Sequence, residues 1–283
     1  MPHTLADATF RSSRPERTLT SVLLDIDATG VVVGHRGAAA CAPENTLPSF
    51  TRALQDGAVA LEFDVHASAD GIPVVHHDAT LERTTNGRGP IAARTAAELR
   101  ALDAAAHFTP DGGRTYPLRG TGVVVPTLDD VLAAFPGVPL IIEIKTAAAS
   151  AATRATIERH DAAARAVVAS FDPRALNVFR DAPFAIGATQ PDVARLLAAA
   201  LGGVRLATRP PFHVASVPRR WRGLPLPVGR FARLLRPWGV TVHVWTVDEA
   251  PVAAALWRAG VHGVISNDPA TVRRGRGETR GEK

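Results

Sequence analysis

The chain has 283 residues, 46% of them hydrophobic, and a formal net charge of +5 at pH 7. This length allows one large α/β domain or two small ones, with ample apolar material for a core. It contains no apolar run long enough to cross a bilayer, and its one cysteine, Cys41, excludes an internal disulfide.

The basic charge is not arranged for nucleic-acid binding. The arginines are scattered, and the only dense basic run is a tail at residues 273–283. Aromatic side chains that could stack on bases make up only 5% of the chain. The first 28 residues also lack a compact apolar segment followed by a small-residue cleavage site. We therefore expect a cytoplasmic protein that neither binds nucleic acid nor has a transmembrane segment.

The predicted elements begin after a polar N-terminal extension, residues 1–28, which carries one short helix near residues 19–25. The first strand covers residues 31–35 and is apolar up to Gly34, as expected for a strand covered on both faces. A helix begins near Leu47, with a proline in its first turn. Two strands follow, at 60–66 and 72–76.

Residues 79–125 interrupt this alternation. The stretch is rich in Gly, Thr, Arg and Pro, and it contains one helical piece near residues 95–102. We therefore expect a small insertion after the second strand. A helix at 127–135 and a strand at 139–145 restore the alternation.

From there strands and helices alternate to the end of the domain. We expect strands at 166–171, 184–188, within the proline-rich stretch 204–227, at 240–246 and at 261–265, with helices at 173–180, 191–201, 228–237 and 248–259. Alternating βα units imply a parallel sheet, and eight main strands favour a closed (β/α)₈ TIM barrel over residues 29–272. An open, doubly wound sheet is the alternative.

Charged side chains interrupt strands that should otherwise be buried. Glu62 and Asp64 lie two residues apart in one strand, and Glu143 and Lys145 do so in another, so each pair shares a face. Desolvating three carboxylates without compensation would cost far too much free energy. Because oxygen ligands of this kind suit hard divalent cations, the sequence predicts a Mg²⁺ or Ca²⁺ site at Glu62, Asp64 and Glu143.

Lys145 is unusual for this composition. The chain has 32 basic residues, but only Lys145 and Lys283 are lysines. Lysine provides a compact point charge, whereas arginine provides a rigid planar fork. We interpret Lys145 as a functional cation; the alternative is a residue that merely neutralises Glu143.

An ordered series of motifs extends from about residue 31 to residue 270. The motifs are His35-Arg36-Gly37, Pro43-Glu44-Asn45-Thr46, Leu61-Glu62-Phe63-Asp64-Val65, Asp70 to Asp78, Leu81-Glu82-Arg83-Thr84-Thr85, Ile142-Glu143-Ile144-Lys145, Ser170-Phe171-Asp172, Val244-Trp245-Thr246-Val247 and Ser266-Asn267-Asp268-Pro269. This set resembles the glycerophosphodiester phosphodiesterase family. The resemblance implies a TIM barrel with a small insertion after the second strand. It also implies metal-dependent hydrolysis of small-molecule glycerophosphodiesters to glycerol 3-phosphate and an alcohol.

The resemblance also implies roles for individual residues. The metal ligands would be the three carboxylates already named, and His35 and His77 would be the acid–base pair. We favour His35 as the base and His77 as the acid, with the glycerol 2-hydroxyl as the nucleophile. Arg36 and Lys145 would neutralise phosphate oxygens, and Trp245 would pack against the glycerol or the head group.

Other functions are kept as alternatives. A lipid-directed phospholipase C or D-like enzyme on the same barrel would need an apolar rim, for which residues 210–212 and the region around Trp221 are the candidates. A non-catalytic, basic nucleic-acid-binding protein would bind in a salt-dependent way without a metal. A sugar isomerase or aldolase is disfavoured, because His35, Arg36 and Lys145 suit a phosphate. The sequence leaves open the choice between Mg²⁺ and Ca²⁺, the head-group alcohol and the oligomeric state.

Overall fold

Eight parallel strands form a nearly closed barrel in the computed structural model, which describes residues 21–181 and 183–278. They are β1 (Val31–His35), β2 (Ala60–Ala67), β4 (Leu140–Ile144), β5 (Ala166–Ala169), β6 (Ala185–Ile186), β7 (Val214–Pro218), β10 (Thr241–Trp245) and β11 (Gly263–Ser266). Their order is β6-β5-β4-β2-β1-β11-β10-β7, and a parallel bridge between Gly187 and Val214 joins the two ends. The predicted TIM barrel is confirmed.

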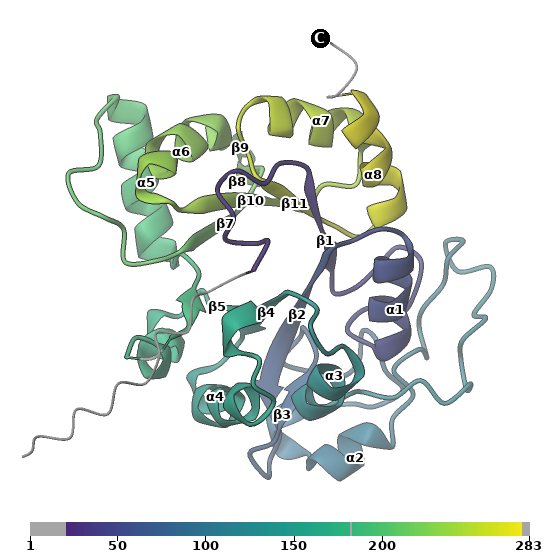
Figure 1. Ribbon diagram of the computed structural model, residues 1–283. Helices are drawn as coiled ribbons and strands as arrows, with labels where there is room; N and C mark the ends of the chain where they lie inside the picture. Colours follow the sequence, from purple (N-terminus) through teal and green to yellow (C-terminus); the bar gives the residue numbers. More distant parts are fainter. Residues whose placement is uncertain (1–20, 182, 279–283) are drawn as a thin grey trace, which may run out of the picture.

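Helices surround this barrel (Figure 1). Apart from a helix in the insertion, the α-helices are α1 (Leu47–Gln55), α3 (Leu128–Ala134), α4 (Ser150–Arg159), α5 (Gln190–Gly202), α6 (Val228–Leu235), α7 (Ala250–Arg258) and α8 (Pro269–Glu278). The helix predicted at 173–180 is instead a 3₁₀ helix, η4 (Pro173–Phe179). Helix α8 includes the first residues of the segment that we interpreted as a basic tail. No helix of the described residues is long and apolar enough to span a bilayer.

Alternation along the strands divides the apolar residues into two cores. Leu61, Phe63 and Val65 of β2 belong to the large core between barrel and helices. Ala60 of the same strand belongs to a smaller core inside the barrel, together with Val31 and other residues from the strands. Because successive strand residues point to opposite faces, the even-numbered positions of β2 face the barrel interior.

The described part of the N-terminal extension, residues 21–28, closes the barrel at the N-terminal ends of its strands. It forms turns rather than the helix expected near 19–25, whose residues 19 and 20 lie outside the described range. Leu23 is fully buried in the inner core, and its carbonyl accepts a hydrogen bond of 2.7 Å from Thr241 Oγ1. Arg236 binds the Ile26 carbonyl and the Asp27 carboxylate. These residues are therefore a structural part of the barrel.

Replacing Leu23 with alanine is expected to destabilise the fold by about 3 kcal/mol, because a buried leucine loses its contacts and leaves a cavity. Urea unfolding followed by circular dichroism measures this change. The matched control is Leu201→Ala, since Leu201 is 67% exposed on α5. Equal stability of the two variants would contradict the structural role of Leu23.

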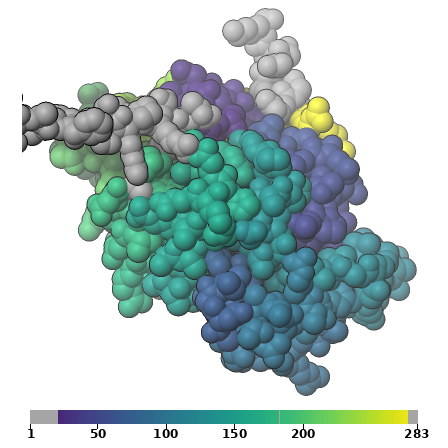
Figure 2. Space-filling model, turned by 60° about the horizontal axis from the view of Figure 1, so that its bottom comes forward, coloured from purple at the N-terminus to yellow at the C-terminus, as the bar shows by residue number. Residues whose placement is uncertain are grey.

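The insertion forms a small lobe with its own core. Strand β3 (Pro73–Val75) pairs antiparallel with β2, and η1 (Ile91–Ala93) and α2 (Ala96–Arg100) follow. Leu81, Ile91 and Leu99 are buried in a cluster separate from the two barrel cores. In Figure 2 this segment, coloured blue, projects from the lower right of the molecule. The helical piece expected near 95–102 corresponds to α2.

Candidate active site

The C-terminal ends of the strands surround one pocket, as in TIM-barrel enzymes. It brings together all eight residues that we singled out from the sequence: His35, Arg36, Glu62, Asp64, His77, Glu143, Lys145 and Trp245. Small and apolar residues complete its wall, among them Ile141, Ala169, Phe171, Gly187 and Ile265. Successive side chains of a strand point to opposite faces of the sheet, and the charged residues of β2 and β4 occupy the positions that face the barrel interior. These residues therefore meet in one pocket.

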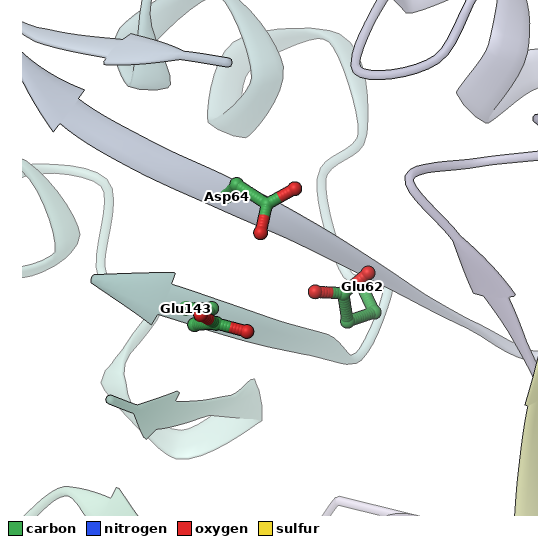
Figure 3. Close-up of side chains that lie close together, drawn as sticks. All are labelled: Glu62, Asp64 and Glu143. Atoms are coloured by element: carbon green, nitrogen blue, oxygen red, sulfur yellow. The ribbon is translucent and has the colours of Figure 1, made fainter. Parts of the chain in front are cut away.

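Three carboxylates form the centre of the pocket. One oxygen from each of Glu62, Asp64 and Glu143 lies within 4.8 Å of the other two. Figure 3 shows that these side chains come from the neighbouring strands β2 and β4, and strand pairing places Asp64 directly beside Glu143. Such a group of oxygen donors is suited to a hard divalent cation.

The electrostatics of the three carboxylates supports this fit. Burial, reinforced by the charges of Asp64 and Glu143, raises the pKa of Glu62 well above its ordinary value. Burial also raises the pKa of Glu143, although Lys145 partly offsets it. For Asp64 the opposing effect of burial is outweighed by Lys145 and Arg36, so its pKa is lowered. The cluster therefore carries more negative charge than its environment stabilises, and a divalent cation would compensate the excess.

Two cations already contact this cluster. Lys145 Nζ lies 2.7 Å from Asp64 Oδ1 and 2.6 Å from Glu143 Oε1. The backbone N–H of Arg36 donates to Glu62 Oε2 at 3.1 Å, and the Arg36 Nε lies 3.3 Å from Asp64 Oδ2. Lys145 thus sits between two of the three carboxylates.

The loop after β1 has a backbone that only particular residues permit. Gly37 has a φ of +88°, and an added Cβ would come within 2.5 Å of the Ser49 backbone. Arg36 also adopts a positive φ, of +52°. This tight turn against α1 explains why glycine follows His35-Arg36 and how the Arg36 N–H is directed at Glu62.

His35 is oriented by a chain of hydrogen bonds from the opposite end of the sequence. Asn267 Nδ2 donates to Asp248 Oδ2 at 2.9 Å, and this bond fixes the orientation of the Asn267 amide. Its Oδ1 is then the acceptor for His35 Nδ1 at 2.7 Å, so Nδ1 carries a proton and Nε2 has a free lone pair. Burial, followed by the charge of Arg36, lowers the pKa of His35. The ring is therefore neutral at neutral pH, and its Nε2 lone pair is available to a proton.

His77 is held by a second chain of charged groups. Its Nδ1 lies 2.6 Å from Asp78 Oδ1, and Asp78 in turn accepts hydrogen bonds from Arg83. The other side of the Arg83 guanidinium binds Glu44, which also pairs with Arg36. Although burial opposes it, the hydrogen bonds and charges of Arg83 and Arg36 lower the pKa of Glu44 to about 2. This network connects the β1 loop to His77 through a residue of the insertion.

Several of these residues had no assigned role in the sequence analysis. Asn267, Asp248 and Arg83 act through contacts between distant parts of the chain, although Asn267 and Arg83 belong to the quoted motifs. Asn45, from another of those motifs, donates to Asp64 Oδ2 at 2.9 Å. His76 does not line the pocket; it binds the Asp78 carbonyl and Thr84.

Aromatic rings form one wall of the pocket. Trp245, at the end of β10, makes an edge-to-face contact with Phe171 at a centroid distance of 6.2 Å. Phe171 is 47% exposed, so this pair lies at the pocket opening. A pocket lined by both an apolar wall and a charged cluster suits a ligand with one anionic part and one less polar part.

Comparison with known proteins agrees with this geometry. Residues 35–271 match the model of the glycerophosphoryl diester phosphodiesterase family. The chain belongs to this family. It is 28% identical over 259 residues to a glycerophosphodiester phosphodiesterase from Caldanaerobacter subterraneus subsp. tengcongensis, a match that covers 86% of this chain and 96% of the relative. It is 30% identical to a probable glycerophosphodiester phosphodiesterase 2 from Mycobacterium tuberculosis, over 84% of this chain and 87% of that protein.

Solved structures of the family share the fold. The glycerophosphoryl diester phosphodiesterase domain of another Mycobacterium tuberculosis protein superposes with a TM-score of 0.80 at 21% identity, covering 88% of this chain and 99% of that one. A phosphodiesterase from Oleispira antarctica, solved in complex with the product sn-glycerol-3-phosphate, has a TM-score of 0.71 at 26% identity and covers 88% of this chain and 97% of that one. Family membership makes this chain a phosphoric diester hydrolase.

Proposed function

We propose that this chain is a metal-dependent phosphodiesterase that hydrolyses glycerophosphodiesters to glycerol 3-phosphate and an alcohol, with His35 and His77 as the acid–base pair. One observation carries the proposal. Two histidines, oriented by separate hydrogen-bond chains, line the same pocket as a cluster of three carboxylates and two cations. The product complex of the Oleispira antarctica enzyme supports the choice of substrate.

Glu62, Asp64 and Glu143 would hold the divalent cation. All three offer oxygen ligands, which suit Mg²⁺ or Ca²⁺, and their excess negative charge favours either ion. When bound, the ion would polarise a phosphoryl oxygen as a Lewis acid and lower the pKa of a coordinated hydroxyl.

Arg36 and Lys145 would bind the phosphodiester. Both side chains line the pocket and contact Asp64, so a phosphate beside the cluster lies within their reach. Their positive charges would stabilise the oxygens that gain negative charge in the transition state. The neighbouring Trp245 and Phe171 would pack against the glycerol or the head group.

The histidines would move the protons. Neutral His35 takes the proton of the glycerol 2-hydroxyl at Nε2, since its Nδ1 is committed to Asn267. The hydroxyl oxygen attacks phosphorus, the bond from phosphorus to the alcohol oxygen breaks, and His77 gives that oxygen a proton. Water then opens the resulting cyclic phosphate to glycerol 3-phosphate, with the two histidines in exchanged roles.

The proposal includes a small-molecule partner, which the same product complex supports. It also includes a cytoplasmic location and the absence of nucleic-acid binding. The lipid-directed alternative is favoured by one specific feature, a hairpin that exposes Trp221 and Leu224.

Hydrolysis of glycerophosphocholine tests the proposal. Enzyme dialysed against EDTA is expected to release less than about one hundredth of the glycerol 3-phosphate and choline released by untreated enzyme, because transition-state charge would lose its main stabilisation. Mg²⁺ or Ca²⁺ is expected to restore the release. Formation of glycerol and phosphocholine would instead indicate cleavage on the other side of phosphorus, and metal-independent release would contradict the assigned role of the carboxylates.

A further inference from the structure

A short hairpin follows β7 at the pocket end of the barrel. Strands β8 (Arg220–Trp221) and β9 (Leu224–Pro225) pair antiparallel and form a two-stranded sheet separate from the barrel. The two residues between them, Arg222 and Gly223, have φ values of +50° and +82°. Two consecutive positive φ angles are typical of the tight type I′ turn, so the hairpin has a defined shape.

One face of this hairpin is apolar. Trp221 and Leu224 are directly paired in the ladder, so their side chains project from the same face. They are 52% and 71% exposed, and neither belongs to a hydrophobic core of the described residues. The stability of the fold therefore does not account for these two side chains.

Arginines flank the apolar pair along the chain. Arg220 is paired with Pro225 and so projects from the other face of the hairpin, where its guanidinium donates to the Gly223 carbonyl at 2.9 Å. Arg219 precedes the hairpin and lies 3.7 Å from the Glu249 carboxylate. Arg219, Arg220 and Arg222 lie within four consecutive positions, and the Arg222 guanidinium stacks over the Trp221 ring at 4.9 Å from its centroid. An aromatic ring with adjacent cations is the combination that anchors proteins at the headgroup level of bilayers. Two apolar side chains are too small an area for a stable protein–protein interface.

The hairpin is attached directly to the wall of the pocket. The Arg219 N–H donates to the Trp245 carbonyl at 3.1 Å, and Trp245 lines the pocket together with the half-exposed Phe171. The other candidate rim, residues 210–212, differs, because Phe212 is only 5% exposed. A surface that bound the hairpin would therefore lie beside the pocket opening.

We propose that the hairpin Arg220–Pro225 docks the enzyme on anionic lipid bilayers, with Trp221 and Leu224 in the headgroup region and the arginines facing lipid phosphates. Binding needs both components, since neither two apolar side chains nor three cations alone anchor a protein stably. The consequence for substrates rests on the proposed function: a docked pocket would reach glycerophosphodiesters that carry an acyl chain and reside in the membrane.

Vesicle sedimentation tests the docking. The full chain is expected to co-sediment with vesicles of phosphatidylcholine containing 30% phosphatidylglycerol in roughly 0.1 M NaCl, where surface charges still interact, and far less with pure phosphatidylcholine. The pair Arg220→Ser and Arg222→Ser should weaken this binding about 30-fold. The pair Trp221→Ser and Leu224→Ser should weaken it at least about 10-fold.

The matched control is the pair Leu201→Ser and Val204→Ser, which removes two apolar side chains that are 67% and 57% exposed elsewhere. This control should bind like the wild type, and all variants should hydrolyse soluble glycerophosphocholine at the wild-type rate. Equal sedimentation with both kinds of vesicle, or unchanged binding by either hairpin variant, would overturn the docking. Because sedimentation is measured without substrate, a failure to hydrolyse glycerophosphocholine would contradict the proposed function and leave the docking result intact.

Discussion

A Glu62→Gln enzyme is expected to lose about 1,000-fold in kcat/KM and yet to unfold at a higher temperature than the wild type in metal-free buffer. The loss of activity follows from the removal of one charged ligand, and it corresponds to about 4 kcal/mol of transition-state stabilisation. The gain in stability follows because glutamine preserves the shape of the side chain and removes its charge from a repulsive, buried cluster.

The size of this gain in stability depends on pH. Since the folded-state pKa of Glu62 lies well above its ordinary value of 4.5, the folded protein keeps a proton that the unfolded chain releases. Wild-type stability without metal therefore falls as the pH rises from about 4.5 toward the raised pKa, at up to about 1.4 kcal/mol per pH unit. Glutamine has no such loss, so the variant's advantage should be larger at pH 8 than at pH 4.5.

Thermal unfolding in EDTA at these two pH values, with and without added Mg²⁺, measures both effects. A stabilisation of about 1 kcal/mol would raise Tm by about 2–4 °C for a chain of this size. Glu158→Gln, on an exposed turn of α4, is the matched control and should change neither activity nor metal-induced stabilisation. If Glu62→Gln gained as much stability from Mg²⁺ as the wild type, Glu62 would not be a ligand.

Replacing either His35 or His77 with alanine is expected to lower kcat by about 10²–10⁴-fold while KM changes little. Both rings are held by hydrogen bonds through Nδ1, which leaves Nε2 as the atom for proton transfer. Because the two groups act in the same reaction, the double variant should be little slower than the slower single variant. Steady-state kinetics on glycerophosphocholine measures these losses.

The pH–rate profile distinguishes the two roles. Because burial and Arg36 lower the pKa of His35, the acidic limb of kcat/KM should lie below pH 6.5, and residual activity of His35→Ala should lack this limb. His160→Ala is the control, since His160 pairs with Asp129 on the outer surface and should change nothing. An acidic limb that persisted in His35→Ala would rule out His35 as the base.

The local pattern of apolar residues was sufficient to predict several barrel strands. The strands β1, β2, β4 and β10 could be predicted because apolar residues alternate between two buried faces, and the period of two places Glu62 with Asp64 on the same side. The pairing of Asp64 with Glu143 on the neighbouring strand follows from the parallel order of the βα units. Two helices that the sequence predicted are not α-helical in the structure. The segment η4 is a 3₁₀ helix, and residues 21–25 form turns.

The orientation of the site residues depends on contacts across the whole chain. His35 and Asn267 are 232 positions apart, and Thr241 and Leu23 are 218 apart, so no local periodicity relates them. Arg83 joins Glu44 to Asp78 only because the insertion folds back over the β1 loop. These hydrogen-bond and ion-pair partners come together only when the whole chain packs into its folded structure.

By itself, the sequence determined the barrel, the eight pocket residues and their chemical types, because these depend on strand period and on the order of motifs. Three features follow from the folded structure alone: Nε2 is the unbonded nitrogen of His35 and His77, Lys145 contacts two carboxylates, and residues 21–28 close the barrel. The folded structure also decided that Trp221 is exposed while Phe212 is buried. The physical reason is that burial and hydrogen-bond direction are properties of the neighbours in space, which a single chain specifies only once it has folded.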